Sequence, residues 1–130
     1  MRDAIADEIA RAFRLEQFND HLAVEKGTSP RTNEAYMHDL ARFATFCHIK
    51  GAKTPDGASA KILREYVYHL KDLGLSSSSI RRNVSAVRSY FRFMLGEGAL
   101  VRDPSERLEA PKRWRTLPEV LTVDEAEKLI

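Results

Sequence analysis

The chain has 130 residues, a length typical of one domain. Hydrophobic residues make up 43% of it and charged residues 31%, a balance that excludes intrinsic disorder and predicts a soluble globular protein. The single cysteine, Cys47, excludes a disulfide framework and a cysteine-based zinc site. No apolar run approaches the ~20 residues of a membrane span. The start of the chain is also too acidic for a signal peptide, so we expect a cytoplasmic protein without membrane contact.

The net charge of +2 is unevenly distributed along the chain. Residues 1–25 and residues 116–130 each have a balance of −3, whereas residues 26–115 hold 17 basic and 9 acidic side chains, a balance of +8. Such asymmetry often marks the part of a chain that binds a polyanion. A solvated basic surface without a partner is the alternative.

Helical periodicity dominates the sequence, which has no internal repeat and no useful run of strand-like alternation. The first helix is predicted from about residue 3 to residue 26, with Gly27 ending it in the left-handed conformation that glycine accepts. Its inward-facing residues are expected to be Ile5, Ile9, Phe13, Leu15, Phe18 and Leu22.

A second helix is predicted from Ser29 to about Lys50, because a serine N-cap followed by a proline at the first position is a strong helix start. Gly51 is expected to end it, before a turn-rich stretch over residues 51–57. The inward stripe of this helix is predicted to contain Tyr36, Leu40, Phe43, Ala44 and Cys47.

The third helix is expected to begin with Ser59 as its N-cap and to end at Gly74. Its buried row is predicted to be Ile62, Tyr66, Leu70 and Leu73. We expect Tyr36 and Tyr66 to be core residues with their hydroxyl groups at the surface.

The fourth helix is predicted to start within residues 76–79, where any of four serines could cap it, and to run to about Leu95 before Gly96 and Gly98. A short fifth helix is expected over residues 103–108. The fourth helix has the clearest amphipathic pattern, with apolar residues at Ile80, Val84, Val87, Phe91 and Met94.

The C-terminal part of the sequence indicates a linker followed by another helix. Two prolines flank a basic stretch over residues 111–118, and Thr122 with Glu125 forms a capping box. We expect residues 1–110 to form a helical domain, residues 111–120 a basic linker, and residues 121–130 the first turns of a further, truncated domain.

The polar face of the fourth helix is the strongest candidate for a binding surface. Between Ser76 and Leu95 the sequence has four arginines and no acidic residue, whereas an ordinary solvated helix mixes both signs. Phosphate groups would supply the missing counter-charge, and arginine also suits the acceptor edge of guanine. A face that merely keeps the helix soluble is the alternative. The candidate residues are Arg81, Arg82, Ser85, Arg88, Ser89 and Arg92.

The start of the second helix is another candidate, because free backbone amides and the helix dipole attract phosphate. Thr28, Ser29 and Thr32 lie there with Arg31 beside them. Plain capping by Ser29 is the alternative, and the two roles are compatible. Arg42 and His38 could extend the surface, although Glu34 shares their face.

The linker is the third candidate. Lys112, Arg113 and Arg115 surround Trp114 and could follow a nucleic-acid backbone, or could simply be solvated while Trp114 packs on the preceding helices.

No part of the sequence points to chemistry within these residues. The histidines at positions 21, 38, 48 and 69 lack metal-ligand spacing, and no phosphate-binding glycine loop, carboxylate pair or nucleophile–base motif is present. We therefore expect no catalytic residue, no metal and no cofactor.

Six short motifs occur in an order and spacing that resemble those of tyrosine recombinases. The motifs are Thr32-x-x-x-Tyr36-x-x-Asp39-Leu40, Ser85-Ala86-Val87-Arg88-x-x-Phe91, Asp103-Pro104-Ser105, Pro111-Lys112, Leu117-Pro118 and Leu121-Thr122-x-x-Glu125-Ala126. From about Phe13 onward the chain resembles the N-terminal core-binding (SAM-like) domain of a Xer-type recombinase or phage-type integrase.

The resemblance implies an all-α fold, a small bundle of four main crossed helices plus a short fifth helix, that forms half of a clamp around double-stranded DNA. It implies that the second and fourth helices face the major groove and that the first contacts a neighbouring protomer in a tetramer on paired DNA sites. The catalytic residues of the family lie in the domain after the linker. None of Tyr36, Tyr66, Tyr68 or Tyr90 occupies the position of the nucleophile, so we expect this chain to bind DNA and cut nothing.

Two functions remain open from the sequence. The first is a DNA-binding module of a site-specific recombinase, in which Arg31, Arg81, Arg88 and Arg92 bind phosphate while Arg82, Ser85 and Ser89 read base edges. The second is a helical protein-interaction module whose basic face meets an acidic partner, for which Phe93 at the edge of the polar face would be an apolar contact. We expect the isolated domain to be monomeric.

Overall fold

The computed structural model describes residues 2–25 and 27–110, and this part of the chain is helical, without a strand. The predicted all-α bundle is therefore confirmed. The elements are α1 (Arg2–Ala12), α2 (Leu15–Val24), α3 (Pro30–Ile49), a 3-10 turn (Pro55–Gly57), α4 (Ala60–Asp72) and α5 (Ser77–Gly96).

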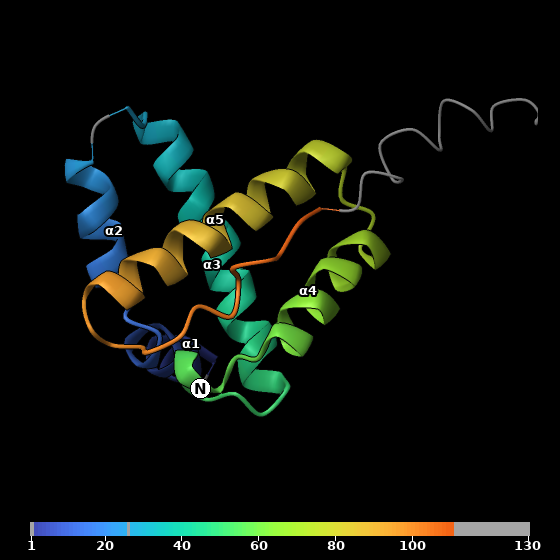
Figure 1. Ribbon diagram of the computed structural model, residues 1–130, viewed down its shortest axis with the longest axis horizontal. Helices are drawn as coiled ribbons and strands as arrows, with labels where there is room; N and C mark the ends of the chain where they lie inside the picture. The colour runs from blue at the N-terminus through green and yellow to red at the C-terminus, as the bar shows by residue number, and fades with distance from the viewer. Residues whose placement is uncertain (1, 26, 111–130) are drawn as a thin grey trace, which may run out of the picture.

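The two longest helices, α3 and α5, cross each other at the centre of the bundle (Figure 1). The helices α1 and α2 pack on α3, and α4 packs against both α3 and α5. After α5 the chain turns back and runs beside it toward α4 (Figure 1). Residues far apart in the sequence are therefore brought together where α3 and α5 cross.

The prediction of one continuous helix over residues 3–26 is wrong. The chain breaks after α1, where Arg14 adopts the left-handed conformation with φ 56°. The break allows both Phe13 and Leu15 to be buried, while Ile5, which was expected to face inward, is 49% exposed. The other predicted inward residues of this region, Ile9, Phe13, Leu15, Phe18 and Leu22, are buried.

The predicted serine N-caps of the second, third and fourth helices are confirmed. Ser29 accepts a hydrogen bond from the Thr32 amide at the start of α3, and Ser59 accepts one from the Ile62 amide at the start of α4. Among the four candidate serines, Ser76 is the N-cap of α5. At the other ends, Gly27, Gly51 and Gly74 have φ values of 90°, 97° and 87°, the left-handed conformation that follows a helix C-terminus.

The buried row of α4 is shifted from the predicted one. Tyr66 and Leu70 are buried as expected, but Ile62 is half-buried and Leu73 is 55% exposed at the C-cap. Leu63 and Val67 take the remaining core positions. Because α4 packs against both α3 and α5, a wider face of α4 is buried than the predicted single row.

Residues 103–108 form turns instead of the predicted short helix. Two i,i+3 backbone hydrogen bonds are present, from Glu106 to Asp103 and from Leu108 to Ser105. The Asp103 carboxylate accepts from the backbone amide and hydroxyl of Ser105, at 2.9 Å and 2.6 Å. This side-chain cap offers the backbone an alternative to continued helix.

Aromatic side chains fill the core between the crossing helices. Phe43 makes edge-on contacts with Tyr66 and Phe91, at ring-centroid distances of 5.2 Å and 5.8 Å. Tyr90 contacts Phe91 and Phe18 in the same manner, at 5.0 Å and 5.7 Å. Such edge-to-face pairs contribute ~1 kcal/mol each beyond the burial of area, and they fix the crossing of α3 and α5. The predicted α5 stripe of Ile80, Val84, Val87, Phe91 and Met94 is buried throughout.

Candidate nucleic-acid interface

The predicted candidate residues on the polar face of α5 differ in their exposure to solvent. Arg81, Ser85 and Arg92 are exposed, and Ser89 is half-buried. Neither Arg81 nor Arg92 has an ion pair or a hydrogen bond within the described residues. These two guanidinium groups are therefore available to an external anion.

Arg82 departs from the prediction that the arginines of α5 lack a counter-charge. Its Nε and Nη2 atoms donate to the two carboxylate oxygens of Asp39 on α3, at 2.8 Å and 2.9 Å. The Asp39 carboxylate is 1% exposed, whereas the Arg82 side chain is 40% exposed. The hydrogen bonds that Arg82 donates to Asp39 hold the pKa of Arg82 above its usual value. The pair thus joins α3 to α5 and cancels the charge of one of the four arginines.

Arg88 is the second arginine of α5 with a partner in the chain. Its Nη1 atom donates a 3.1 Å hydrogen bond to the carbonyl oxygen of Leu108, which holds the returning segment beside α5. A carbonyl oxygen satisfies a donor without removing the positive charge. Arg88 is half-buried and keeps its attraction for phosphate, but it also stabilises the fold.

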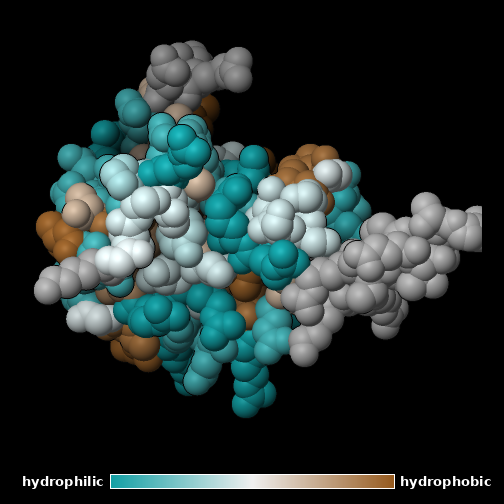
Figure 2. All heavy atoms as spheres, turned by 90° about the horizontal axis from the view of Figure 1, so that it is seen from above, coloured by the Kyte–Doolittle hydropathy of each residue, from teal (hydrophilic) through white to brown (hydrophobic). Residues whose placement is uncertain are grey.

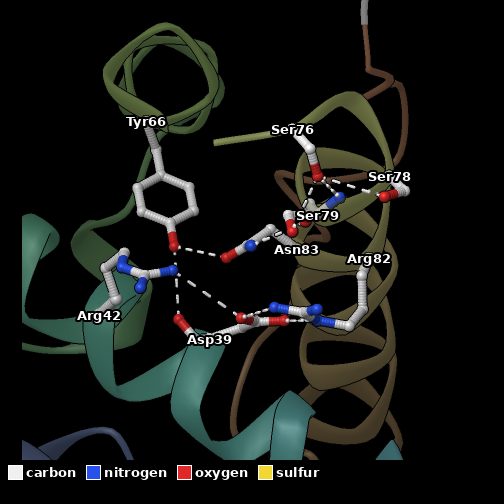
Figure 3. Close-up of polar contacts among 8 residues, drawn as sticks. All are labelled: Asp39, Arg42, Tyr66, Ser76, Ser78, Ser79, Arg82 and Asn83. Atoms are coloured by element: carbon white, nitrogen blue, oxygen red, sulfur yellow. Dashed lines mark hydrogen bonds and ion pairs between the residues drawn. The ribbon is translucent and has the colours of Figure 1, made fainter. Parts of the chain in front are cut away.

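A buried polar network supports the Asp39–Arg82 pair (Figure 3). The Tyr66 hydroxyl donates to Asn83 Oδ1 at 2.8 Å and lies 3.3 Å from the backbone carbonyl oxygen of Asp39. Asn83 Nδ2 in turn donates to the carbonyl oxygen of Ser79 at 2.9 Å. The Tyr66 hydroxyl is inside the protein, so the expectation of a surface hydroxyl is wrong. Burial raises its pKa, against the lowering effect of the nearby Arg42 guanidinium.

Asp39 is the residue at this surface that the sequence did not predict as a candidate. A detectable signal was present, because a carboxylate on the apolar stripe between Tyr36 and Phe43 must find a partner when the stripe is buried. Arg42, one turn further along α3, places its Nη1 atom 3.8 Å from Asp39 Oδ1.

At the start of α3, the side chains of Thr28, Ser29 and Thr32 make hydrogen bonds within the chain. The Ser29 hydroxyl accepts from the Thr32 amide at 3.1 Å and donates to the Thr32 hydroxyl at 3.0 Å. The Thr28 hydroxyl donates to the carbonyl oxygen of Glu25 at 3.3 Å. Arg31 is exposed. The capping interpretation is therefore confirmed for Ser29, and Arg31 remains available to an anion.

The structure brings some of the candidates together and keeps others apart. Arg82 meets α3 at Asp39, eight residues after Arg31, which is about 12 Å along a helix axis. Arg92 lies ten residues after Arg82, about 15 Å along α5. The basic residues are therefore spaced along the two crossing helices and are not gathered at one point. The linker candidates Lys112, Arg113 and Arg115, like the predicted boundaries at residues 111–120 and 121–130, lie outside the described residues.

Other kinds of site find little support in the described part of the chain. Within residues 2–25 and 27–110, no group of three or more histidine, cysteine or acidic side chains is placed to hold a metal ion. No helix in these residues is both long and apolar enough to span a membrane. Phe93, the one apolar candidate of the protein-interaction hypothesis, packs against Phe18 and His21 at centroid distances of 5.6 Å and 4.8 Å. Phe93 is half-buried, so these contacts within the bundle cover much of its ring.

Comparison with known proteins identifies relatives over most of the chain. It is 38% identical over 116 residues to the tyrosine recombinase XerD of Chlorobaculum tepidum, an alignment that covers 89% of this chain and 38% of the relative. It is 36% identical over 115 residues to XerD of Bifidobacterium longum and 33% identical over 117 residues to the tyrosine recombinase XerC of a Roseiflexus species. These two alignments cover 88% and 90% of this chain and 37% of each relative.

The chain thus spans about two fifths of the length of the curated relatives it matches. A comparison with solved structures found no match. The family model described as "Phage integrase, N-terminal SAM-like domain" matches residues 15–98, which include α2 to α5 and more than half of the sequence. The chain therefore belongs to the family of phage integrase N-terminal SAM-like domains.

Proposed function

We propose that this chain is the DNA-binding domain of a tyrosine recombinase and grips duplex DNA beside the site of strand exchange. The observation that carries the proposal is the exposed side of α5, where Arg81 and Arg92 have no partner within the described residues. No acidic side chain occurs between Ser76 and Leu95 to oppose them. A double-stranded phosphate backbone supplies the counter-charge that this face lacks.

The residues divide into two roles on this surface. Arg31, Arg81, Arg88 and Arg92 bind phosphate, since each keeps its full positive charge at or near the surface. The N-terminus of α3, where Thr28, Ser29 and Thr32 lie, also binds phosphate through its backbone amides and the helix dipole. Arg82, Ser85 and Ser89 lie between these charges on α5 and face base edges. Lys112, Arg113 and Arg115 extend the contact along the backbone after residue 110.

Residues 1–110 form the binding domain in this proposal, residues 111–120 the linker, and residues 121–130 the first turns of the catalytic domain. The covalent phosphotyrosine chemistry and the assembly of a tetramer on paired sites are then properties of the whole recombinase. The present chain binds DNA and does not cut it. Its affinity is expected to be modest, because an isolated half-clamp lacks the effective concentration that a linked second domain provides.

A protein-interaction function has less support. Phe93 is packed against the bundle, and the exposed large apolar residues are scattered over several helices and the segment after α5. Figure 2 shows the face seen from above the view of Figure 1, where hydrophilic and neutral residues predominate and hydrophobic atoms form small, separate patches. This distribution favours a polar ligand such as duplex DNA.

The test is a titration of labelled duplex DNA with this chain at several salt concentrations. If Arg31, Arg81, Arg88 and Arg92 each neutralise one phosphate, the plot of log affinity against log salt has a slope of about −3.6, which steepens to about −6.3 if Lys112, Arg113 and Arg115 each neutralise one as well. Absence of binding at low salt by a sample with a cooperative thermal transition would refute the proposal.

A further inference from the structure

The most unusual feature of the basic surface is a guanidinium group bound along one side by a buried carboxylate. Arg82 Nε and Nη2 donate to the two oxygens of Asp39, at 2.8 Å and 2.9 Å. We infer that Arg82 reads a guanine base in the major groove, and that Asp39 is the positioning residue that orients it. This inference rests on the proposed DNA-binding function and assigns a specificity determinant within it.

The side-on contact leaves the outer end of the guanidinium group free. An arginine side chain has five N–H donors, and Asp39 takes the one on Nε and one on Nη2. The remaining three are on Nη1 and Nη2, and no further hydrogen bond is recorded for them within the described residues. The side chain as a whole is 40% exposed, so part of it is accessible from solvent although Asp39 covers its Nε side.

The free end has the geometry that guanine requires. Two adjacent N–H groups of arginine bind the O6 and N7 acceptors of guanine at the same time. Adenine presents a donor where guanine has O6, so the same two donors meet one acceptor and one opposing donor. An arginine held in one plane by its other edge therefore distinguishes the two purines.

The charge of the pair favours a base over a phosphate as the ligand. Asp39 lies between Arg82 and Arg42, so two cations share one carboxylate and each adds less attraction for the backbone than Arg81 or Arg92, which have no acidic partner in the described chain. Neutral base edges need directed donors more than they need net charge. The pair supplies directed donors.

The support behind Asp39 is rigid enough to fix this orientation. The carboxylate is 1% exposed. The Tyr66 hydroxyl of α4 donates to Asn83 on α5 and lies 3.3 Å from the Asp39 backbone carbonyl oxygen. Figure 3 shows Asp39 lying between Arg42 on its own helix and Arg82 on α5. Three helices therefore set the plane of one side chain, which an exposed arginine on its own does not achieve.

The experiment selects duplexes from a library with a randomised segment, using the 130-residue chain, and compares it with the Arg82→Lys variant. The wild-type chain is expected to enrich guanine at one position by roughly 5- to 150-fold over adenine, the range of a good bidentate contact. Arg82→Lys keeps the charge but has a single ammonium group. Lysine can also donate to guanine O6 and N7, but its one ammonium group is held by Asp39 and lacks the planar fork of arginine. The preference is therefore expected to fall at least about fivefold while the salt dependence stays unchanged.

Two further variants test whether the Asp39–Arg82 pair recognises a base or only stabilises the fold. Asp39→Asn keeps the size of the side chain but opposes one guanidinium donor with its amide, and is expected to lose the same preference. The double variant Asp39→Asn with Arg82→Lys should then lose no more than either single change, because both act through one contact. Arg81→Ala is the matched control, expected to weaken all duplexes alike and leave the selected base in place. Thermal midpoints identify any variant that has lost its fold, in which case Arg82→Lys decides.

The outcomes distinguish guanine recognition by Arg82 from DNA binding by the chain as a whole. Salt-dependent binding without guanine enrichment, or with enrichment that survives Arg82→Lys, overturns the inference and leaves DNA binding intact; the ion pair is then a tie between α3 and α5. A folded wild-type chain that binds no duplex at low salt overturns the proposed function, and the inference with it.

Discussion

The Tyr90 hydroxyl on α5 donates a 2.6 Å hydrogen bond to the backbone carbonyl oxygen of Phe13, at the break between α1 and α2. Both residues are fully buried. The left-handed Arg14 that follows interrupts the helix, so the carbonyl group of Phe13 needs a partner from elsewhere in the protein. Tyr90 supplies it across the core, and its own pKa is raised by burial. The break and the position of α5 are thereby stabilised together.

Removal of this hydroxyl should destabilise the protein without changing its surface. Tyr90→Phe leaves the buried Phe13 carbonyl unpaired, which costs about 1–3 kcal/mol. Urea unfolding measures the loss. Tyr36→Phe is the control, because no hydrogen bond is recorded for the half-buried Tyr36 hydroxyl within the described residues. Equal unfolding free energies for Tyr90→Phe and the wild type would show that water replaces the lost donor.

Local sequence signals predicted the elements whose structure is decided locally. The α5 stripe repeats at helical spacing, and Ser29 and Ser59 precede helices that they indeed cap. The break at Arg14 was missed because neither glycine nor proline marks it. Its signal was geometric: Phe13 and Leu15 are two residues apart, which puts them about 200° apart on a continuous helix. Both are buried, and one helix cannot bury both against one surface.

The site was predicted less completely than the fold, for a related reason. Arg81 and Arg92 are exposed as their helical positions suggested. The partners of the other two arginines depend on tertiary structure, since Arg82 meets a residue 43 positions away and Arg88 one 20 positions away. No pattern within a single helix contains this information. It follows from the crossing of α3 and α5 and from the returning chain.

The buried thiol of Cys47 should make stability fall in alkaline solution. Burial raises its pKa from 9.0 to about 12, so above about pH 9 the thiol ionises in the unfolded chain and stays neutral in the folded one. The unfolded state then binds fewer protons, and the free energy of unfolding decreases as pH rises. Below about pH 9 the thiol is neutral in both states and leaves the free energy of unfolding unchanged. Between about pH 9 and pH 10 its ionisation in the unfolded chain lowers that free energy by about 1 kcal/mol.

Urea unfolding at a series of pH values measures this loss. Cys47→Ala is the matched variant: its stability is lower at every pH because core packing is lost, but its decline over the same interval should be shallower. Parallel declines in the two proteins would assign the effect to other groups.

The two serine caps of α3 and α4 allow capping to be separated from DNA binding. Ser29→Ala and Ser59→Ala each remove the acceptor for one helical amide, Thr32 or Ile62, and each should cost ~1 kcal/mol of stability. If the start of α3 also meets phosphate, Ser29→Ala additionally weakens duplex binding by roughly 2- to 10-fold, whereas Ser59→Ala leaves it unchanged. Both are measured at a temperature where the two variants remain folded. Equal DNA affinities would restrict Ser29 to capping.

The phosphate-binding role of α5 is tested most cleanly at its two unpartnered arginines. Arg88 is unsuitable because its hydrogen bond to Leu108 also holds the chain in place. Arg81→Ala combined with Arg92→Ala should reduce the magnitude of the salt slope by about 1.8, which corresponds to two released phosphate contacts. The thermal midpoint should change little, since both side chains are exposed.

Arg64→Ala provides the control for this pair. It removes an exposed arginine of α4 and so alters the net charge without touching α5. A general attraction between a basic protein and DNA would respond to the loss of any cation, and Arg64→Ala would then change the slope as much as either α5 substitution does. If the binding surface lies along α5, the magnitude of the salt slope falls when Arg81 and Arg92 are replaced and is unchanged when Arg64 is replaced.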